Sequence, residues 1–211
     1  MAERVDGEFA HLFFPGDPDK PTLLLLHGTG ADENDLVPLG RAVLPGATLL
    51  SARGQVLENG MPRFFRRFAE GVLDVDDLKA RAQALASWVR AQVNERGAPA
   101  RVVALGFSNG ANIAAGVLLA HPGVLSGAVL LRAMMPYEPG APPSLAGVPV
   151  LICSGRRDPI VPAQQVERLA GLLRSGGADV AVAWQDDAGH GLVQADIDAT
   201  AGFLSRFVES P

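Results

Sequence analysis

The stretch RVVALGFSNGANIAAGVLLAH, residues 101–121, decides the fold. Its first part is an apolar run typical of a buried strand, and its last part is an Ala-rich segment typical of a helix. Between them lies a G-x-S-x-G motif, from Gly106 to Gly110. In such a motif the serine sits at the tip of a sharp turn from strand into helix, and the glycines let neighbouring backbone approach. We therefore predict that Ser108 is a nucleophile at the carboxyl end of a strand.

Similar apolar runs occur on both sides of this unit and alternate with amphipathic segments. Runs of this kind suit parallel strands that are covered on both faces. The strand-like runs are 21–28, 47–54, 101–108, 126–133, 148–155 and 179–185. The helix-like segments are 35–44, 74–96, 109–121, 162–174 and 195–208. This order predicts an α/β protein with about six parallel strands in a doubly wound sheet, and an extra edge strand near 8–14.

The length of 211 residues fits one domain over 1–211. The connection between the runs at 126–133 and 148–155 is short and rich in Pro. It has no room for a large helical lid, so we expect an open site without a lid domain.

A serine hydroxyl needs a base, and in such a fold the order along the chain is Ser, acid, His. Of the two histidines after Ser108, His121 ends the following helix, whereas His190 lies in a loop after the last strand. Loops at the carboxyl ends of strands assemble α/β sites, so His190 is the predicted base. The acids between Ser108 and His190 that we considered are Glu138, Asp158, Glu167, Asp179, Asp186 and Asp187. Asp158 directly follows a strand and is the predicted acid, which would hold the His tautomer and stabilise the imidazolium.

Two backbone N–H groups are candidates for an oxyanion hole. One belongs to Asn109, the residue after the nucleophile, and the other to Thr29, which follows the early strand in LLLLHGTG. His27 in the same turn is expected to brace the loop by hydrogen bonding rather than to act as a base.

Four segments together resemble a known family. LLLLHGTGADENDLVPL, GFSNGANIA, SGRRDPIVP and AGHGL, in this order and at these separations, are similar to the carboxylesterase/phospholipase family of α/β-hydrolases. This lidless group includes the acyl-protein thioesterases, and ENGMPRFFRRFAEG is closer to its bacterial esterase branch. The resemblance runs from about residue 20 to the end, and it implies an α/β-hydrolase fold with the same triad and oxyanion donors. Eukaryotic acyl-protein thioesterases usually carry Leu at the position of Thr29 and Gln at that of Asn109, which puts long-chain thioesterase activity in question here.

The segment MPRFFRRF, residues 61–68, has two interpretations. It is either a loop beside the site, with aromatic walls and a cation for an anionic substrate group, or a structural loop whose arginines pair with Asp74, Asp76 or Asp77. The residues that we expect to line the substrate pocket are Phe65, Arg66, Met135 and Ile160.

The composition of the chain excludes several classes of partner and cofactor. With 18 Lys+Arg against 23 Asp+Glu, the formal net charge is −5, which argues against nucleic acid as a partner. The single cysteine, Cys153, excludes a disulfide framework and a Cys-based zinc site, and the four histidines lack metal-ligand spacing. We expect no cofactor and no metal.

The N-terminus does not resemble a signal peptide, and no apolar run is long enough to span a membrane. We therefore expect a cytoplasmic protein, and a homodimer is an open alternative.

The sequence therefore predicts a serine carboxylesterase that hydrolyses small, short-chain or aromatic esters through an acyl-enzyme. An acyl thioesterase acting on acyl-proteins or acyl-CoA with the same triad is the first alternative. A non-catalytic binding protein of the same fold is the second.

Overall fold

An eight-stranded sheet forms the centre of the computed structural model, which describes residues 3–5 and 8–208. In spatial order its strands are β1 (Glu3–Val5), β2 (His11–Phe14), β4 (Thr48–Ala52), β3 (Thr22–Leu26), β9 (Val102–Phe107), β10 (Gly127–Leu131), β11 (Pro149–Gly155) and β12 (Asp179–Gln185). The six strands from β4 to β12 run parallel, and β1 and β2 are antiparallel additions at one end. The predicted doubly wound, mostly parallel sheet is confirmed.

The inner strands are apolar because both of their faces are covered. Leu23 to Leu26 of β3 are at most 1% exposed, and β3 pairs in register with β4 on one side and β9 on the other. β12 has only one neighbour in the sheet, and it is correspondingly only half-buried. Continuous burial explains why these strands read as unbroken apolar runs rather than as alternating patterns.

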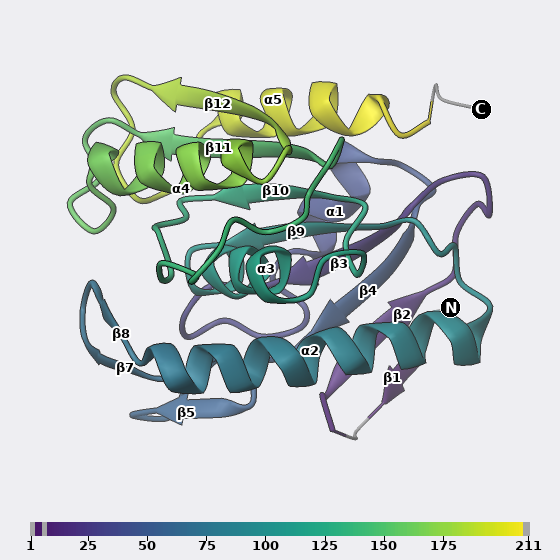
Figure 1. The fold of residues 1–211 in the computed structure, drawn as a ribbon. Helices are drawn as coiled ribbons and strands as arrows, with labels where there is room; N and C mark the ends of the chain where they lie inside the picture. Colours follow the sequence, from purple (N-terminus) through teal and green to yellow (C-terminus); the bar gives the residue numbers. More distant parts are fainter. Residues whose placement is uncertain (1–2, 6–7, 209–211) are drawn as a thin grey trace.

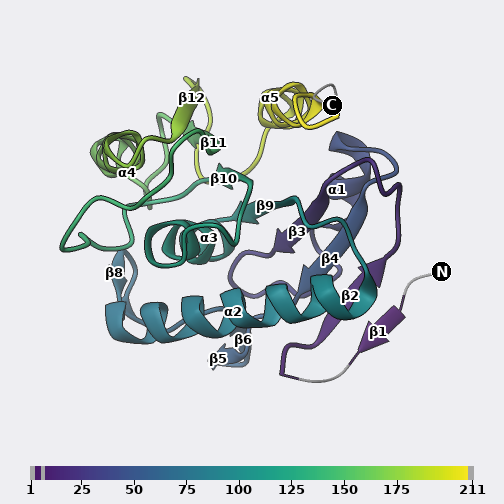
Figure 2. The same ribbon diagram turned by 45° about the vertical axis from the view of Figure 1, so that its right-hand side comes forward.

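Helices cover both faces of the sheet (Figures 1 and 2). α1 (Val37–Val43) and α5 (Gln194–Ser205) pack on one face, where they share an apolar cluster with Leu23, Leu25 and Val129. α2 (Val75–Arg96), α3 (Asn109–Ala120) and α4 (Ala163–Ser175) cover the other face. Asp74 caps α2 by accepting the N–H of Asp77 at 3.1 Å, and Gly97 in the left-handed region ends it.

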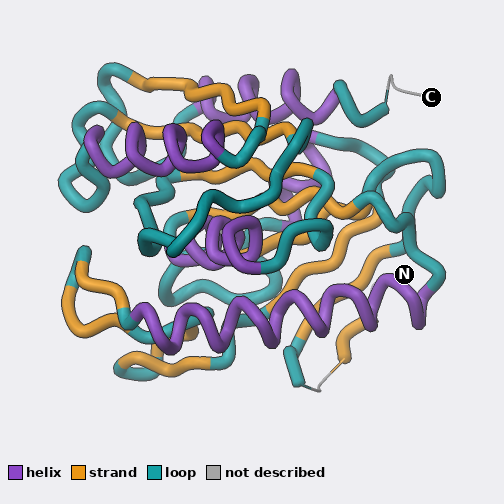
Figure 3. The backbone as a smooth tube through the Cα atoms, viewed as in Figure 1, coloured by secondary structure: helices purple, strands orange, loops and turns teal. Residues whose placement is uncertain are grey.

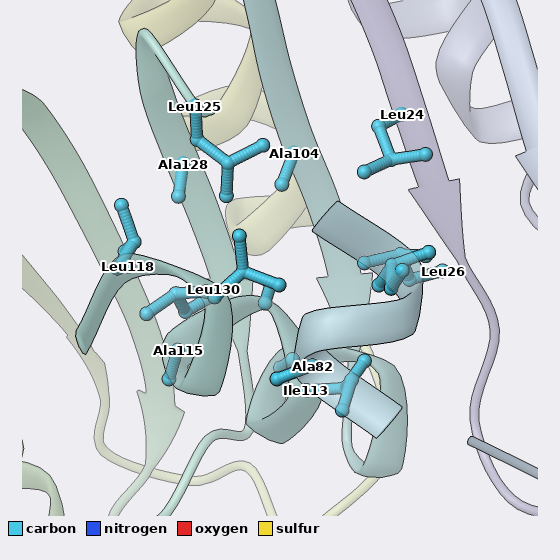
Figure 4. Packing of buried hydrophobic residues seen from close by; sticks show 14 of the residues in the cluster. Leu24, Leu26, Ala82, Ala104, Ile113, Ala115, Leu118, Leu125, Ala128 and Leu130 are labelled. Atoms are coloured by element: carbon cyan, nitrogen blue, oxygen red, sulfur yellow. The ribbon is translucent and has the colours of Figure 1, made fainter. Parts of the chain in front are cut away.

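α3 is the most deeply buried helix, because it lies between the sheet and α2. Figure 4 shows part of this cluster, with Ile113 of α3 beside Ala82 of α2. Gly116 lets the two helices approach closely, since a Cβ there would lie 2.8 Å from Leu78 Cδ2. The tight packing holds the beginning of α3, and with it Ser108, in a fixed position relative to the sheet.

The structure differs from the sequence prediction at the N-terminal end and in the segment before α2. The strand expected near 8–14 is β2, which starts at His11 and lies between β4 and β1 rather than at the edge. Two hairpins that the sequence analysis did not predict occupy the segment before α2. They consist of β5 (Val56–Glu58) with β6 (Met61–Arg63), and β7 (Arg67–Ala69) with β8 (Val72–Leu73).

The connection between β10 and β11 holds no helix or strand, as expected, and Figure 3 draws it as loop. The second hairpin stands on the side of the molecule toward which β10, β11 and β12 point (Figure 1). Over residues 3–5 and 8–208 this is the α/β-hydrolase fold, and no lid domain is inserted between its strands.

Candidate active site

Ser108 lies at the junction of β9 and α3, with φ 51° and ψ −112°. A non-glycine residue at positive φ is strained, and this conformation turns the chain sharply from strand into helix. The two glycines of the motif are sterically required. A Cβ on Gly106 would lie 2.6 Å from the carbonyl oxygen of Gly110, and one on Gly110 would lie 1.9 Å from that of Leu26.

Ser108, His190 and Asp158 form one chain of hydrogen bonds. Ser108 Oγ lies 2.9 Å from His190 Nε2, and His190 Nδ1 lies 2.8 Å from Asp158 Oδ2. The other carboxylate oxygen of Asp158 accepts the N–H groups of Ile160 at 2.8 Å and Val161 at 3.0 Å. The Asp158 carboxylate is therefore held in place by backbone, with one oxygen facing the imidazole. The structure brings together the three residues that the sequence analysis selected.

Other acids that the sequence offered as partners of His190 form ion pairs away from it. Asp186 and Asp187 are exposed and pair with Arg156 and Arg157. Glu138 pairs with Arg168. His121 is the C-cap of α3, so it lies at the end of the helix opposite Ser108.

Arg132 fixes the loop that carries His190, and sequence reasoning did not select it. Its fully buried guanidinium donates to the carbonyl oxygens of Gly189 at 3.0 Å and Gly191 at 2.8 Å, the two neighbours of His190. The same group forms a bidentate pair with Asp196 at 2.7 and 3.0 Å. Asp196 also accepts the N–H of Val193 at the start of α5. One cation thus joins the end of β10, the His190 loop and the following helix.

The sequence does carry a signal for this residue. Arg132 is the second-last residue of the apolar run SGAVLLRA and directly follows β10, and a charged residue at the end of a buried strand needs a partner. What the sequence does not show is which acid, 64 residues further on, supplies that partner.

The two candidate oxyanion donors are connected by the segment around β6. The backbone N–H groups of Thr29 and Asn109 have no hydrogen-bond acceptor among the described residues. The Thr29 side chain accepts Arg63 Nη1 at 2.8 Å, and the Asn109 side-chain oxygen accepts the N–H of Phe64 at 2.7 Å. The N–H of Gly30 donates to the carbonyl of Pro62 at 3.0 Å. These contacts hold both loops in a geometry in which two N–H groups are left for a ligand.

His27 braces the loop of Thr29, as expected. Its Nδ1–H donates to the carbonyl of Gly28 at 2.6 Å, and its Nε2 accepts the N–H of Gly54 at 3.0 Å. The second bond requires the neutral ring, and burial lowers the pKa of His27 in the same sense.

A small pocket of about 40 Å³ opens beside Ser108. Its lining residues are Thr29, Arg63, Arg67, Gly71, Leu73, Ser108, Asn109, Asn112, Met134 and Ile160. Of the four residues expected there, only Ile160 is among them. Phe65 is fully buried in the core, and the exposed Arg66 pairs with Asp74 and Asp77. The pocket is lined by Met134 rather than by its neighbour Met135.

The two interpretations of the segment 61–68 therefore each apply to part of it. Phe64, Phe65 and Arg66 are structural, whereas Arg63 and Arg67 reach the pocket. Asp76 is not among the ion-pair partners of Arg66.

Residues 3–5 and 8–208 were also searched for a metal site, a reactive thiol and a membrane-spanning helix. No group of three or more His, Cys, Asp and Glu side chains in this part of the chain is placed to hold a metal ion. Cys153 is buried inside β11, and burial raises the pKa of its thiol to about 12. No helix in the described part has the length and apolar character that would carry it across a bilayer.

The turn at Ser108, the Ser–His–Asp chain and the sheet order together define an α/β-hydrolase. The model of the phospholipase/carboxylesterase family matches residues 9–208, and the chain belongs to that family.

Individual relatives agree with this assignment. The chain is 46% identical over 185 residues to a putative hydrolase, MhqD, of Bacillus subtilis, which spans 87% of this chain and 92% of that protein. The crystal structure of a Bacillus cereus carboxylesterase matches with a TM-score of 0.89 and 40% identity, over 96% of both chains. A carboxylesterase from Mesorhizobium loti matches with a TM-score of 0.90 and 30% identity, over 97% of this chain and 98% of that one. The protein is accordingly an ester hydrolase.

Proposed function

We propose that this protein is a serine carboxylesterase that hydrolyses small, short-chain or aromatic esters through an acyl-enzyme. The observation that carries the proposal is the unbroken hydrogen-bond chain from Ser108 Oγ through His190 to Asp158, beside a pocket of about 40 Å³. Ligand pockets for drug-sized molecules typically measure about 300–1,000 Å³, so a cavity of this size favours small groups over long acyl chains.

The first half of the reaction forms the acyl-enzyme. Ser108 Oγ attacks the ester carbonyl while its proton passes to His190 Nε2. The negative charge that develops on the carbonyl oxygen is stabilised by the N–H groups of Asn109 and Thr29. Asp158 holds the ring with Nδ1–H toward its carboxylate and stabilises the imidazolium. His190 then gives the proton to the leaving alcohol as the C–O bond breaks.

The second half repeats these steps with water. His190 accepts a proton from water, the hydroxide equivalent attacks the acyl carbonyl, and the same two N–H groups stabilise the second oxyanion. Collapse of this intermediate releases the carboxylic acid and returns the proton to Ser108. Every proton and bond is accounted for by these side chains and water.

Hydrolysis of aryl esters of graded acyl length, from acetyl to long chain, tests the proposal. We expect a short-chain optimum that disappears in Ser108→Ala, and labelling of the wild type by a fluorophosphonate probe that the variant does not take up. Wild-type turnover that survives in Ser108→Ala would refute the assignment of the nucleophile. A long-chain optimum, or a strong preference for thioesters, would favour the acyl-thioesterase alternative.

Domain organisation, assembly and location belong to the same proposal. The eight-stranded sheet takes strands from both ends of the described part of the chain, from β1 to β12, which supports one domain over 1–211. We also propose a cytoplasmic location, with which the single buried thiol of Cys153 is compatible. Cell fractionation tests the location, and sedimentation of the purified protein tests whether a homodimer forms.

A further inference from the structure

The pocket beside Ser108 is lined by two charged side chains, and both are arginines. Arg63 comes from β6 and Arg67 from β7, so each of the two hairpins contributes one cation. No Asp or Glu is among the lining residues. The proposed ester hydrolysis uses neither guanidinium for proton transfer, and a neutral short-chain ester gives them nothing to bind.

One carboxylate serves both arginines. Glu58 Oε2 lies 3.1 Å from Arg63 Nε, and Arg67 Nε lies 3.0 and 3.2 Å from the two oxygens of Glu58. Glu58 itself does not line the pocket. Two positive charges therefore share one negative charge, and the cluster keeps a net charge of +1 next to the nucleophile.

The two guanidinium groups have different freedom. Arg63 is 3% exposed and is held by Thr29 Oγ1 at 2.8 Å and by the carbonyl of Phe65 at 3.1 Å. The Arg67 side chain is 24% exposed, and Glu58 is its ion-pair partner. Among the described residues, Nη2 of Arg63 and Nη1 of Arg67 have no hydrogen-bond acceptor. Burial and the charge of Arg67 both lower the pKa of Arg63, which means that another anion nearby would stabilise the cluster.

We propose that Arg63 and Arg67 form a carboxylate subsite, and that the enzyme acts on esters that carry a free carboxylate a few bonds from the ester carbonyl. Half-esters of small dicarboxylic acids are the simplest members of this class. The guanidinium fork matches a carboxylate in shape and charge, and hydrogen bonds between charged partners are about twice as strong as neutral ones. Arg67 contacts the substrate carboxylate, while Arg63 supplies charge and holds the Thr29 loop. This inference rests on the proposed esterase function and names its substrate class.

A matched pair of substrates isolates the charge. Monomethyl glutarate carries the carboxylate, and methyl 5-amino-5-oxopentanoate replaces it with an amide of nearly the same shape. Both hydrolyses release one acid and can be followed in a pH-stat at pH 7.5. We expect the wild type to prefer the half-ester in kcat/KM by about tenfold or more, which corresponds to one charge-assisted hydrogen bond. Equal kcat/KM for the two esters, or a preference for the amide, would overturn the subsite.

Three variants test whether the preference for the half-ester depends on Arg67. Arg67→Gln should reduce the half-ester to amide ratio about tenfold, and Arg67→Lys should restore part of it because the charge returns without the fork. Arg66→Gln is the matched control: Arg66 is the adjacent residue, it lies outside the pocket, and the ratio should stay at the wild-type value. An unchanged ratio in Arg67→Gln would contradict the role of Arg67.

Two further measurements test the subsite on the wild-type protein and separate it from the esterase proposal. Glutarate should inhibit wild-type hydrolysis of an aryl acetate competitively, and glutaramide should not; this comparison holds even where a variant fails to fold. Equal inhibition by the two compounds would count against the subsite. Failure of the esterase proposal looks different, because then the aryl acetate itself is not turned over, or is turned over equally by Ser108→Ala.

Discussion

Replacing Arg132 with Met removes the cation that joins the end of β10 to the His190 loop. The contacts of this cation indicate how far the free energy of unfolding should fall. The Asp196 carboxylate, 1% exposed, would lose its bidentate partner, and an uncompensated buried charge costs about 3–5 kcal/mol. The carbonyls of Gly189 and Gly191 would each lose a donor, which adds roughly 1 kcal/mol per carbonyl. Met fills similar space and meets the same positive φ of 59°, so backbone strain does not differ between the two proteins.

Urea unfolding followed by circular dichroism measures this loss in the free energy of unfolding. The double variant Arg132→Met/Asp196→Asn removes the buried charge while keeping an acceptor for Val193, and it should recover about half of the loss or more. Arg168→Met breaks an exposed pair with Glu138 and should cost less than about 1 kcal/mol. A loss in Arg132→Met no larger than in Arg168→Met, at equal denaturant slope, would refute the reasoning.

Three further predictions concern single residues. Asp158→Asn should lower kcat by up to about ten-thousand-fold, because the amide favours the wrong His tautomer; full activity of this variant in an aryl-ester assay would show that another acid acts. Folded His27 has a pKa below 6.5, so it binds fewer protons than the unfolded chain, and its contribution to stability is present above about pH 6.5 and lost as pH falls toward the folded pKa. The free energy of unfolding should therefore fall less between pH 7.5 and 5.5 in His27→Gln than in the wild type, and equal slopes would contradict this. Cys153, with its thiol pKa raised to about 12, should react with a disulfide reagent at pH 8 only after unfolding, and rapid labelling of the native protein would exclude its buried position.

The sheet was predictable because burial on both faces leaves a strong sequence signal. Runs such as TLLLL in β3 contain nothing but strand-forming or apolar residues, and their order alternates with helical periodicity. The hairpins at 56–73 have no such signal. Their strands are two or three residues long, and Leu57, Phe68 and Val72 are exposed although they are apolar. Short exposed strands follow neither burial pattern, so periodicity does not reveal them.

Ser108, Asp158 and His190 could be selected from the sequence because each follows a recognisable strand. The residues that line the pocket could not, because neighbouring residues along an extended segment point to different sides. An error of one position exchanges Arg66 for Arg67 or Met135 for Met134, and with it a side chain outside the pocket for one that lines it. Only the three-dimensional arrangement shows which of two adjacent residues faces the pocket.

The contacts of Arg132 also bear on how the chain folds as it is synthesised. Its partners lie at 189, 191 and 196, so a growing chain carries this cation at the end of β10 long before they are made. A strand that ends in an unpaired charge cannot be closed off from water at low cost. Burying Arg132 before residues 189–196 have emerged would leave its charge without these partners. We therefore expect this part of the sheet to pack fully only after α5 has been made, and the enzymatic activity of ribosome-bound chains of increasing length would test this.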